Sequence, residues 1–298
     1  MRMLRSKNLL FSMALLALVS GAASGLDLGV EGWLGNLGFS NDRTVTDLTM
    51  PGSDYFWGLS LYGTQSITDA ISFETGFYSD PILRNTCYTL FGYHEKILSV
   101  GVGPFFGIFN DAGTLLKSGI STAVRLELPG IVFVSFRSDS SIGGELVQIG
   151  DYLQSRNDIS FGVYLPNAIC TLSLNSSTFQ QKAAASDVID SLTVYAFSTD
   201  IYKKNVPYRL IVTFSYQSLA RSFVETAATT TASLNSVIIG TEIDITLAHS
   251  LLLQAGIEGN VYSFGLGTLV GSDTNFLFRS FAGLKMNLDS IPYLSRIL

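Results

Sequence analysis

The residues that could act as nucleophiles, bases or metal ligands are few in this chain and lie far apart. It has two histidines, His94 and His249, and two cysteines, Cys87 and Cys170, among 298 residues. Hydrolytic sites need a base beside a nucleophile, or paired carboxylates, and a structural zinc site needs four clustered nitrogen or sulfur ligands. We therefore expect no enzymatic activity, no cofactor and no metal, and we interpret both histidines as polar turn residues.

The remaining candidates are charged residues that stand singly inside otherwise apolar segments. Successive side chains of a β-strand point to opposite faces, so each of these charges opposes an apolar face. Six acids and five bases belong to this group: Glu31, Glu74, Arg125, Glu127, Arg137, Arg209, Glu242, Asp244, Glu258, Arg279 and Lys285. Either they pair across strands and stiffen a wall, or they line a water-filled interior and set its electrostatic field.

The segment 207–217 shows most clearly which elements carry these charges. Tyr208, Leu210, Val212, Phe214 and Tyr216 share one parity, and Arg209, Thr213, Ser215 and Gln217 share the other. The two tyrosines at the ends of the apolar face are about 26 Å apart along a strand, or about 20 Å along the membrane normal at a tilt of about 40°. That height matches the lipid-facing band of a membrane barrel with an aromatic residue at each interface.

The same alternation predicts fourteen strands, with twelve as the alternative count. The predicted strands are 26–38, 54–65, 68–79, 84–94, 97–109, 117–128, 131–138, 157–165, 168–179, 190–201, 206–217, 235–247, 250–264 and 275–288. Short turns alternate with longer polar connections at 39–53, 80–83, 110–116, 139–156, 180–189, 218–234 and 265–274. Alternating short and long connections are typical of an antiparallel up-and-down barrel, although 80–83 is short for an external loop. Cys87 and Cys170 fall on distant predicted strands, so we expect two free, buried thiols.

The amino terminus predicts export. Arg2, Arg5 and Lys7 precede an apolar stretch at 9–19 and then small residues, so we interpret 1–25 as a signal peptide and 26–298 as one barrel domain. Hydrophobic residues make up 47% of the chain and charged residues 14%, yet no later stretch has the roughly 18 apolar residues of a membrane helix. After removal of the signal peptide 15 basic residues would remain against 24 acidic ones, a net charge near −9 that argues against nucleic acid as a partner.

In these features the chain resembles porin-like outer-membrane β-barrel proteins of double-membraned bacteria, with a spirochaete as one candidate source. Gly283, Met286 and Leu288 match the spacing of the final strand that the barrel-assembly machinery recognises in such proteins, although the usual aromatic last residue is absent. The resemblance implies a transmembrane barrel in the cell outer membrane. It also implies outer-membrane lipid, the assembly machinery and periplasmic chaperones as partners.

The function expected from this resemblance is a channel for passive diffusion of small solutes. Fourteen strands leave a pore unless a loop closes it. Two alternatives stay open at this point. One is a surface or adhesive protein whose closed barrel only displays external loops, and the other is uptake of hydrophobic compounds through a lateral opening.

Overall fold

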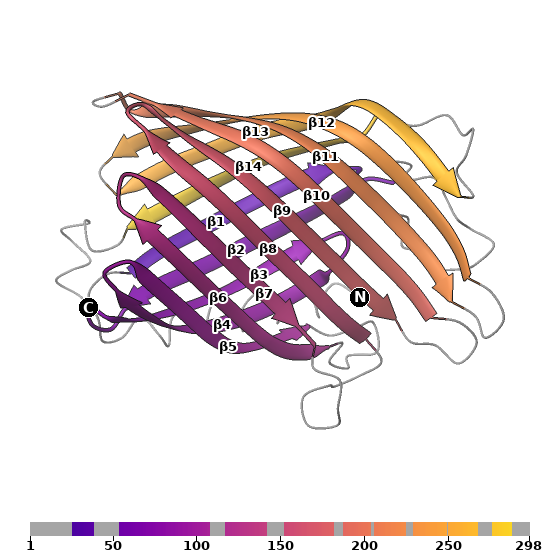
Figure 1. Cartoon of the computed structure of the whole chain (residues 1–298), viewed down its shortest axis with the longest axis horizontal. Coiled ribbons are helices and arrows are strands. Elements are labelled where there is room, and N and C mark those ends of the chain that lie inside the picture. The colour runs from indigo at the N-terminus through magenta and orange to yellow at the C-terminus, as the bar shows by residue number, and fades with distance from the viewer. Residues whose placement is uncertain are drawn as a thin grey trace, which may run out of the picture.

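Fourteen antiparallel strands close into one barrel in the computed structural model of the chain (Figure 1). The structure describes residues 26–38, 54–107, 117–141, 152–181, 187–203, 206–224, 229–248, 250–267 and 276–287. The strands are β1 (Leu26–Gly35), β2 (Phe56–Ser66), β3 (Ile71–Asp80), β4 (Arg84–Glu95), β5 (Leu98–Gly107), β6 (Ser118–Leu128), β7 (Val132–Ser140), β8 (Tyr152–Leu165), β9 (Ala168–Gln181), β10 (Asp187–Tyr202), β11 (Tyr208–Val224), β12 (Thr229–Ala248), β13 (Leu251–Gly267) and β14 (Phe278–Asn287). Each strand pairs with its neighbours in the sequence, and β1 closes the barrel by pairing with β14 from Asp27↔Asn287 to Gly35↔Arg279. The predicted fold class and the count of fourteen are confirmed.

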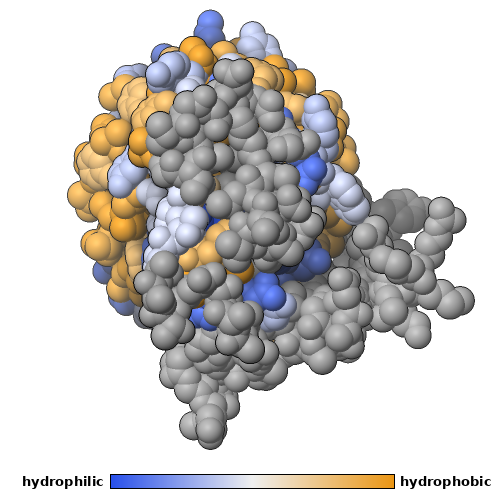
Figure 2. Space-filling model, turned by 90° about the vertical axis from the view of Figure 1, so that its right-hand side faces the viewer, coloured by the Kyte–Doolittle hydropathy of each residue, from blue (hydrophilic) through white to orange (hydrophobic). Residues whose placement is uncertain are grey.

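The outer face of the barrel is apolar because the period-two pattern of each strand turns its apolar side chains outward. On β11, Tyr208, Phe214 and Tyr216 are exposed, whereas Gln217 is buried inside. Figure 2 shows hydrophobic side chains around the flank of the barrel and hydrophilic ones near its end. Within the described part of the chain, no helix is long and apolar enough to cross a membrane.

An aromatic belt marks the level at which the apolar outer face ends. Tyr195 of β10 and Tyr216 of β11 are partners in the register, and their ring centroids are 6.5 Å apart. Val237 of β12 pairs with Tyr216 on one side and with Tyr262 of β13 on the other. Tyrosines prefer the interface between lipid and water, so this belt indicates one edge of the membrane-embedded band.

Above this belt β11 continues, and the polarity of its two faces changes. On β11 the inward side chains Leu219 and Phe223 are apolar and 1% exposed, whereas the outward Ser218 and Ser222 are polar. The register with β12 runs unbroken to Val224↔Thr229, so the inversion reflects the surroundings and not a slip in pairing. On β11 the outer face becomes more polar beyond the belt, and Leu219 and Phe223 of its inner face are buried in the mouth of the barrel.

Strands extend into four of the longer predicted loops. Most of 218–234 belongs to β11 and β12, 139–156 loses its ends to β7 and β8, 180–189 loses its ends to β9 and β10, and 265–274 loses its start to β13. The predicted strands stopped where the apolar outer face stopped, but hydrogen-bonded pairing extends further. Short turns join the strands at the opposite end of the barrel (Figure 1), for example at Gly130, whose φ of 73° favours glycine.

The two cysteines lie on β4 and β9, as expected, and form no disulfide, but both are half-buried and not fully buried as predicted.

Candidate functional site

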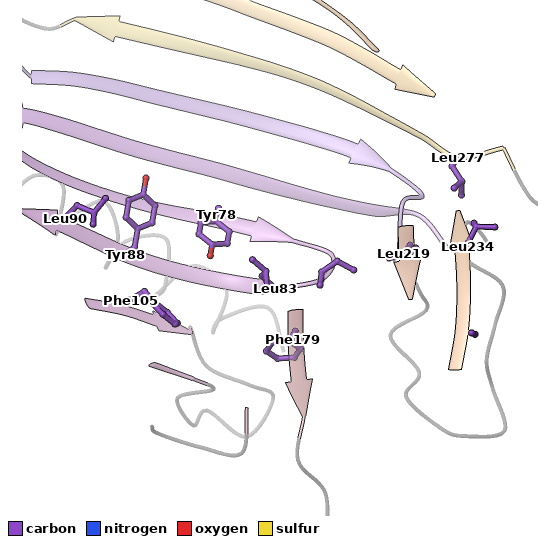
Figure 3. Close-up of a cluster of buried hydrophobic side chains, with 11 residues drawn as sticks. Tyr78, Leu83, Tyr88, Leu90, Phe105, Phe179, Leu219, Leu234 and Leu277 are labelled. Atoms are coloured by element: carbon purple, nitrogen blue, oxygen red, sulfur yellow. The ribbon is translucent and has the colours of Figure 1, made fainter. Parts of the chain in front are cut away.

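The interior of the barrel is divided into two levels, an apolar cluster at the mouth beyond the aromatic belt and a polar chamber below it. The cluster contains Tyr78, Ile82, Leu83, Tyr88, Leu90, Phe105, Phe179, Leu219, Ala232, Leu234 and Leu277 (Figure 3). β4 and β11 lie seven places apart in the ring of fourteen strands, on opposite walls. Side chains from both walls belong to one cluster, so apolar packing crosses the interior at this level.

The connection between β3 and β4 supplies the centre of this cluster. The carboxylate Oδ1 of Asp80 accepts hydrogen bonds from the backbone N–H groups of Ile82 and Leu83, at 2.7 and 2.8 Å. Ile82 and Leu83 are each 1% exposed. The sequence places 80–83 at the same end of the barrel as the longer connections, and in the structure it is a short turn at that end whose side chains fold inward. The turn is short because it folds inward, where its two aliphatic side chains are removed from water.

Lys117 holds this turn from the neighbouring wall. It stands just before β6 with a fully buried side chain, and its ammonium group donates a hydrogen bond to the carbonyl oxygen of Leu83. The same ammonium lies 5.1 Å from the centre of the Phe179 ring. Burial lowers the pKa of Lys117 to about 7, although the carboxylates of Asp80 and Asp139 act in the opposite direction.

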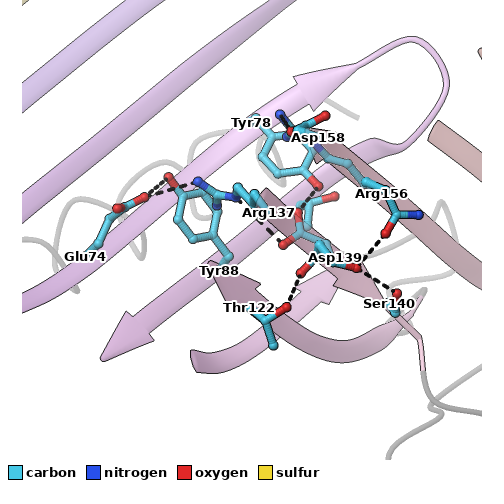
Figure 4. A network of polar contacts seen from close by, with 12 residues as sticks. Glu74, Tyr78, Tyr88, Thr122, Arg137, Asp139, Ser140, Arg156 and Asp158 are labelled. Carbon is cyan, nitrogen blue, oxygen red and sulfur yellow. Dashed lines mark hydrogen bonds and ion pairs between the residues drawn. The ribbon is translucent and has the colours of Figure 1, made fainter. Parts of the chain in front are cut away.

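A polar network lies directly against the cluster (Figure 4). The hydroxyl of Tyr88 donates to Glu74 at 2.8 Å, and Arg137 donates to the same carboxylate at 3.4 Å. The hydroxyl of Tyr78 donates to Asp139 at 3.3 Å and accepts a hydrogen bond from the amide of Gln154 at 2.9 Å. These contacts connect β3, β4, β7 and β8 through the interior and brace that side of the barrel.

Most of the eleven charged residues predicted from the sequence lie in ion pairs or hydrogen bonds with one another or with new partners. The ion pairs are Arg125–Glu127 at 2.7 Å, Arg137–Glu74 at 3.4 Å, Arg209–Asp244 at 2.8 Å and Arg279–Glu258 at 2.8 Å. Glu242 accepts a hydrogen bond from Gln254 at 3.1 Å. Glu31 and Lys285 lie on the adjacent strands β1 and β14, close to the seam of the barrel. The structure therefore brings the predicted residues together as several pairs around the wall and not as one focused site.

Several charged residues of the interior escaped the sequence analysis. Arg221 and Asp190 form a pair at 2.6 Å in which both side chains are 1% exposed, and Arg156 pairs with Asp158 at 2.7 Å. Arg221 and Arg156 fell in predicted loops. Arg221 keeps the parity of Arg209, however, and Lys117 keeps that of Arg125, so continuing each parity by a few residues would have found both.

The polar chamber contains a cavity of about 400 Å³. It lies against the inner wall formed by β3 to β9, and Leu90 borders both the cavity and the apolar cluster. Serine side chains from five strands line it, together with Asn175 and the charged groups of Glu74, Arg125, Arg137 and Asp158. The arrangement can bind a small polar molecule. Its lining also brings one serine hydroxyl next to a histidine, since Ser72 Oγ lies 2.7 Å from His94 Nε2.

Comparisons with known proteins find likeness in shape alone. No family profile matches the sequence, and no curated protein matches it. An outer membrane channel from Pseudomonas putida F1 has a TM-score of 0.47 and 9% identity, over 90% of this chain and 97% of that one. Outer-membrane expressed OmpT of Vibrio cholerae has a TM-score of 0.42 and 9% identity, over 89% and 98%. An anion-selective porin from Comamonas acidovorans has a TM-score of 0.39 and 11% identity, over 88% and 98%.

At these values the likeness carries no argument about function, and the barrel rests on the strand pairing itself. The matches give no support to a spirochaetal source.

Proposed function

We propose that this protein is a channel of the cell outer membrane through which small solutes diffuse passively. The observation that carries the proposal is the contrast between the two faces of a closed barrel. The outer face is apolar up to an aromatic belt, whereas the inner face is charged and holds a polar cavity. A wall of this kind suits lipid outside and water inside.

In this proposal the eleven charged residues predicted from the sequence belong to the wall of the permeation path. Their mutual pairing lowers the net field, so the path itself discriminates weakly between cations and anions. The short turns face the periplasm and the end with the apolar cluster faces outward. Residues 1–25 act as the signal peptide that directs export, and assembly machinery inserts the barrel.

Single-channel recording in planar lipid bilayers tests the proposal. We expect stable ohmic steps from the refolded protein, of small size because the apolar cluster narrows the mouth. Silence would count against a channel only where the inserted protein is folded, which heat-modifiable migration in electrophoresis shows. The channel is rejected when both the folded wild type and a folded variant with a loosened apolar cluster show no conductance.

The cluster itself favours a second candidate, a barrel that displays its external connections without conducting. Packing across the whole mouth is what such a protein needs, because it seals the interior without a separate plug domain. Lateral uptake of hydrophobic compounds has no comparable support, since all fourteen strands pair continuously around the ring.

A further inference from the structure

We propose that the cavity below the apolar cluster binds one uncharged, polyhydroxylated solute of the size of a monosaccharide. This inference rests on the proposed channel function and names the class of solute that occupies the path. Three properties of the cavity carry it: its shape, its unused hydrogen-bonding groups and the neutralisation of its charges.

The cavity exists because small residues of three neighbouring strands face it. They are Gly92 of β4, Gly101 of β5 and Ala123 of β6. A side chain at Gly101 would enter open space, since a Cβ atom there would meet nothing closer than 3.8 Å. The volume of about 400 Å³ is within the range of small-molecule sites. Leu90 belongs to the apolar cluster and also lines the cavity, so a solute would rest directly beneath the cluster.

The wall of the cavity offers hydrogen-bonding groups that no protein group uses. Among the described residues, no side-chain partner is found for Ser99, Ser173 or Asn175, and all three line the cavity. By contrast, Ser135 bonds Ser160 at 2.5 Å, on the same wall. A serine hydroxyl both donates and accepts, and an amide does the same through two different atoms. Vicinal hydroxyl groups of a sugar or polyol have the same dual character and can satisfy several such groups at once.

The charges that line the cavity are already compensated within the protein. Glu74 accepts from Tyr88 and Arg137, and Asp158 accepts from Arg156 at 2.7 Å. Arg125 donates to Glu127 at 2.7 Å and to the hydroxyl of Tyr164 at 3.2 Å. His94, the remaining titratable group of the lining, lies near the end of β4 and not in a turn as the sequence predicted, and it shares a hydrogen bond with Ser72 at 2.7 Å. An ionic solute would lose hydration without gaining an uncompensated counter-charge, whereas a neutral solute avoids that cost.

Ligand-observed NMR titration of the full-length protein in detergent micelles tests the site without using conductance. The probe is D-glucose, compared with gluconate and glucosamine as charged molecules of similar size. We expect saturable binding of glucose and at least tenfold weaker binding of both charged probes. Equal binding of all three would overturn the assignment of a neutral solute, and no saturable glucose binding would overturn the site.

Two variants place the binding in this cavity. Gly101→Leu fills the space, and Ser173→Ala with Asn175→Leu removes unused hydrogen-bonding groups with little change in the backbone. Each should weaken glucose binding at least tenfold. The matched control is Ala255→Leu, because Ala255 pairs with the outward Ile243 and the substitution adds a similar volume on the outer face. Unchanged binding in both cavity variants, with unchanged thermal unfolding, would overturn the location.

Failure of this inference is distinguishable from failure of the channel. Conductance without saturable glucose binding rejects the site and leaves the channel. Glucose binding that the cavity variants abolish, in a barrel that conducts no ions, keeps the site and rejects passive diffusion.

Discussion

Arg221 and Asp190 form an ion pair that is withdrawn from water on both sides, and its two bonds of 2.6 and 3.0 Å make it bidentate. Removing one partner leaves a buried charge, which typically costs about 3–5 kcal/mol. We therefore expect Arg221→Met to lower the free energy of unfolding by roughly that amount in a denaturant titration of the refolded barrel. Arg221→Met combined with Asp190→Leu should recover most of the loss. Arg125→Met is the control, since its pair with Glu127 is 39% and 33% exposed and should matter by less than about 1 kcal/mol.

Lys117 gives a residue-scale prediction about pH. Its ordinary pKa is 10.5, and burial lowers that pKa to about 7 in the closed mouth. The groups that act on it are Asp80 of the turn, Arg84 of β4 and Asp139 of β7. As pH falls from 10.5 toward 7, an exposed lysine takes up a proton that the buried lysine does not, so the native state loses stability over this interval. Below pH 7 both forms are protonated and the loss stays constant.

Thermal unfolding of the wild type and of Lys117→Met at pH 7 and pH 10 measures this effect. The variant lacks the lysine at both values, so its Tm relative to the wild type should be higher at pH 7 than at pH 10. The loss of the hydrogen bond to Leu83 lowers the Tm of the variant by the same amount at both pH values. A difference in Tm that does not change with pH would mean that the lysine is already charged in the closed mouth.

At the scale of a strand, β11 serves two surroundings with one uninterrupted register. Phe214 lies below the aromatic belt on the outer face, and Ala220 lies above it on the same face. Phe214→Arg should cost roughly 2–4 kcal/mol, because it puts a charge into the apolar band, whereas Ala220→Arg near or beyond the interface should cost about 0–1 kcal/mol. Refolding titrations in lipid vesicles compare the two variants. Equal losses would show that the belt at Tyr216 is not the edge of the membrane.

The elements also show how far the sequence could be interpreted. The alternation of Tyr208 to Tyr216 with Arg209 to Gln217 was sufficient to predict the faces of β11, because lipid demands an apolar outer face there. It was insufficient above Tyr216, where Leu219 and Phe223 turn inward and the serines turn outward. At such an inversion, the hydropathy pattern of a strand resembles that of a loop unless the position of the membrane edge is known. The predicted number of strands was correct because pairing across each hairpin is local. Several of the predicted strand ends were wrong because they depend on what surrounds each end of the strand.

The interior was harder to predict, because its contacts join residues from distant strands. The parity of Glu74 and Arg137 was visible in the sequence, but their pairing depends on the curvature that brings β3 within reach of β7, four strands away. The cavity depends on the absence of side-chain volume at Gly101 and Ala123, which no motif signals. The inward fold of 80–83 had one signal, the short length of that connection.

At the scale of the whole molecule, the interior of the barrel has a polar part that holds the cavity and, toward the end opposite the short turns, an apolar cluster with side chains from both walls. Ile82 and Leu83 are buried members of this cluster, each 1% exposed. Burying an aliphatic side chain of this size contributes about 1.5–3 kcal/mol. Ile82→Ser with Leu83→Ser removes this contribution while leaving the hydrogen bonds of the turn to Asp80 available.

We expect this double variant to conduct larger single-channel steps than the wild type in planar bilayers, because water can enter the loosened mouth. Its thermal unfolding temperature should fall, since apolar burial has been lost. Ile131→Ser is the matched control. Ile131 is 61% exposed in a turn at the opposite end of the barrel, so its replacement should leave both readouts near those of the wild type. A lower unfolding temperature with unchanged step size would show that the cluster stabilises the barrel without limiting the pore.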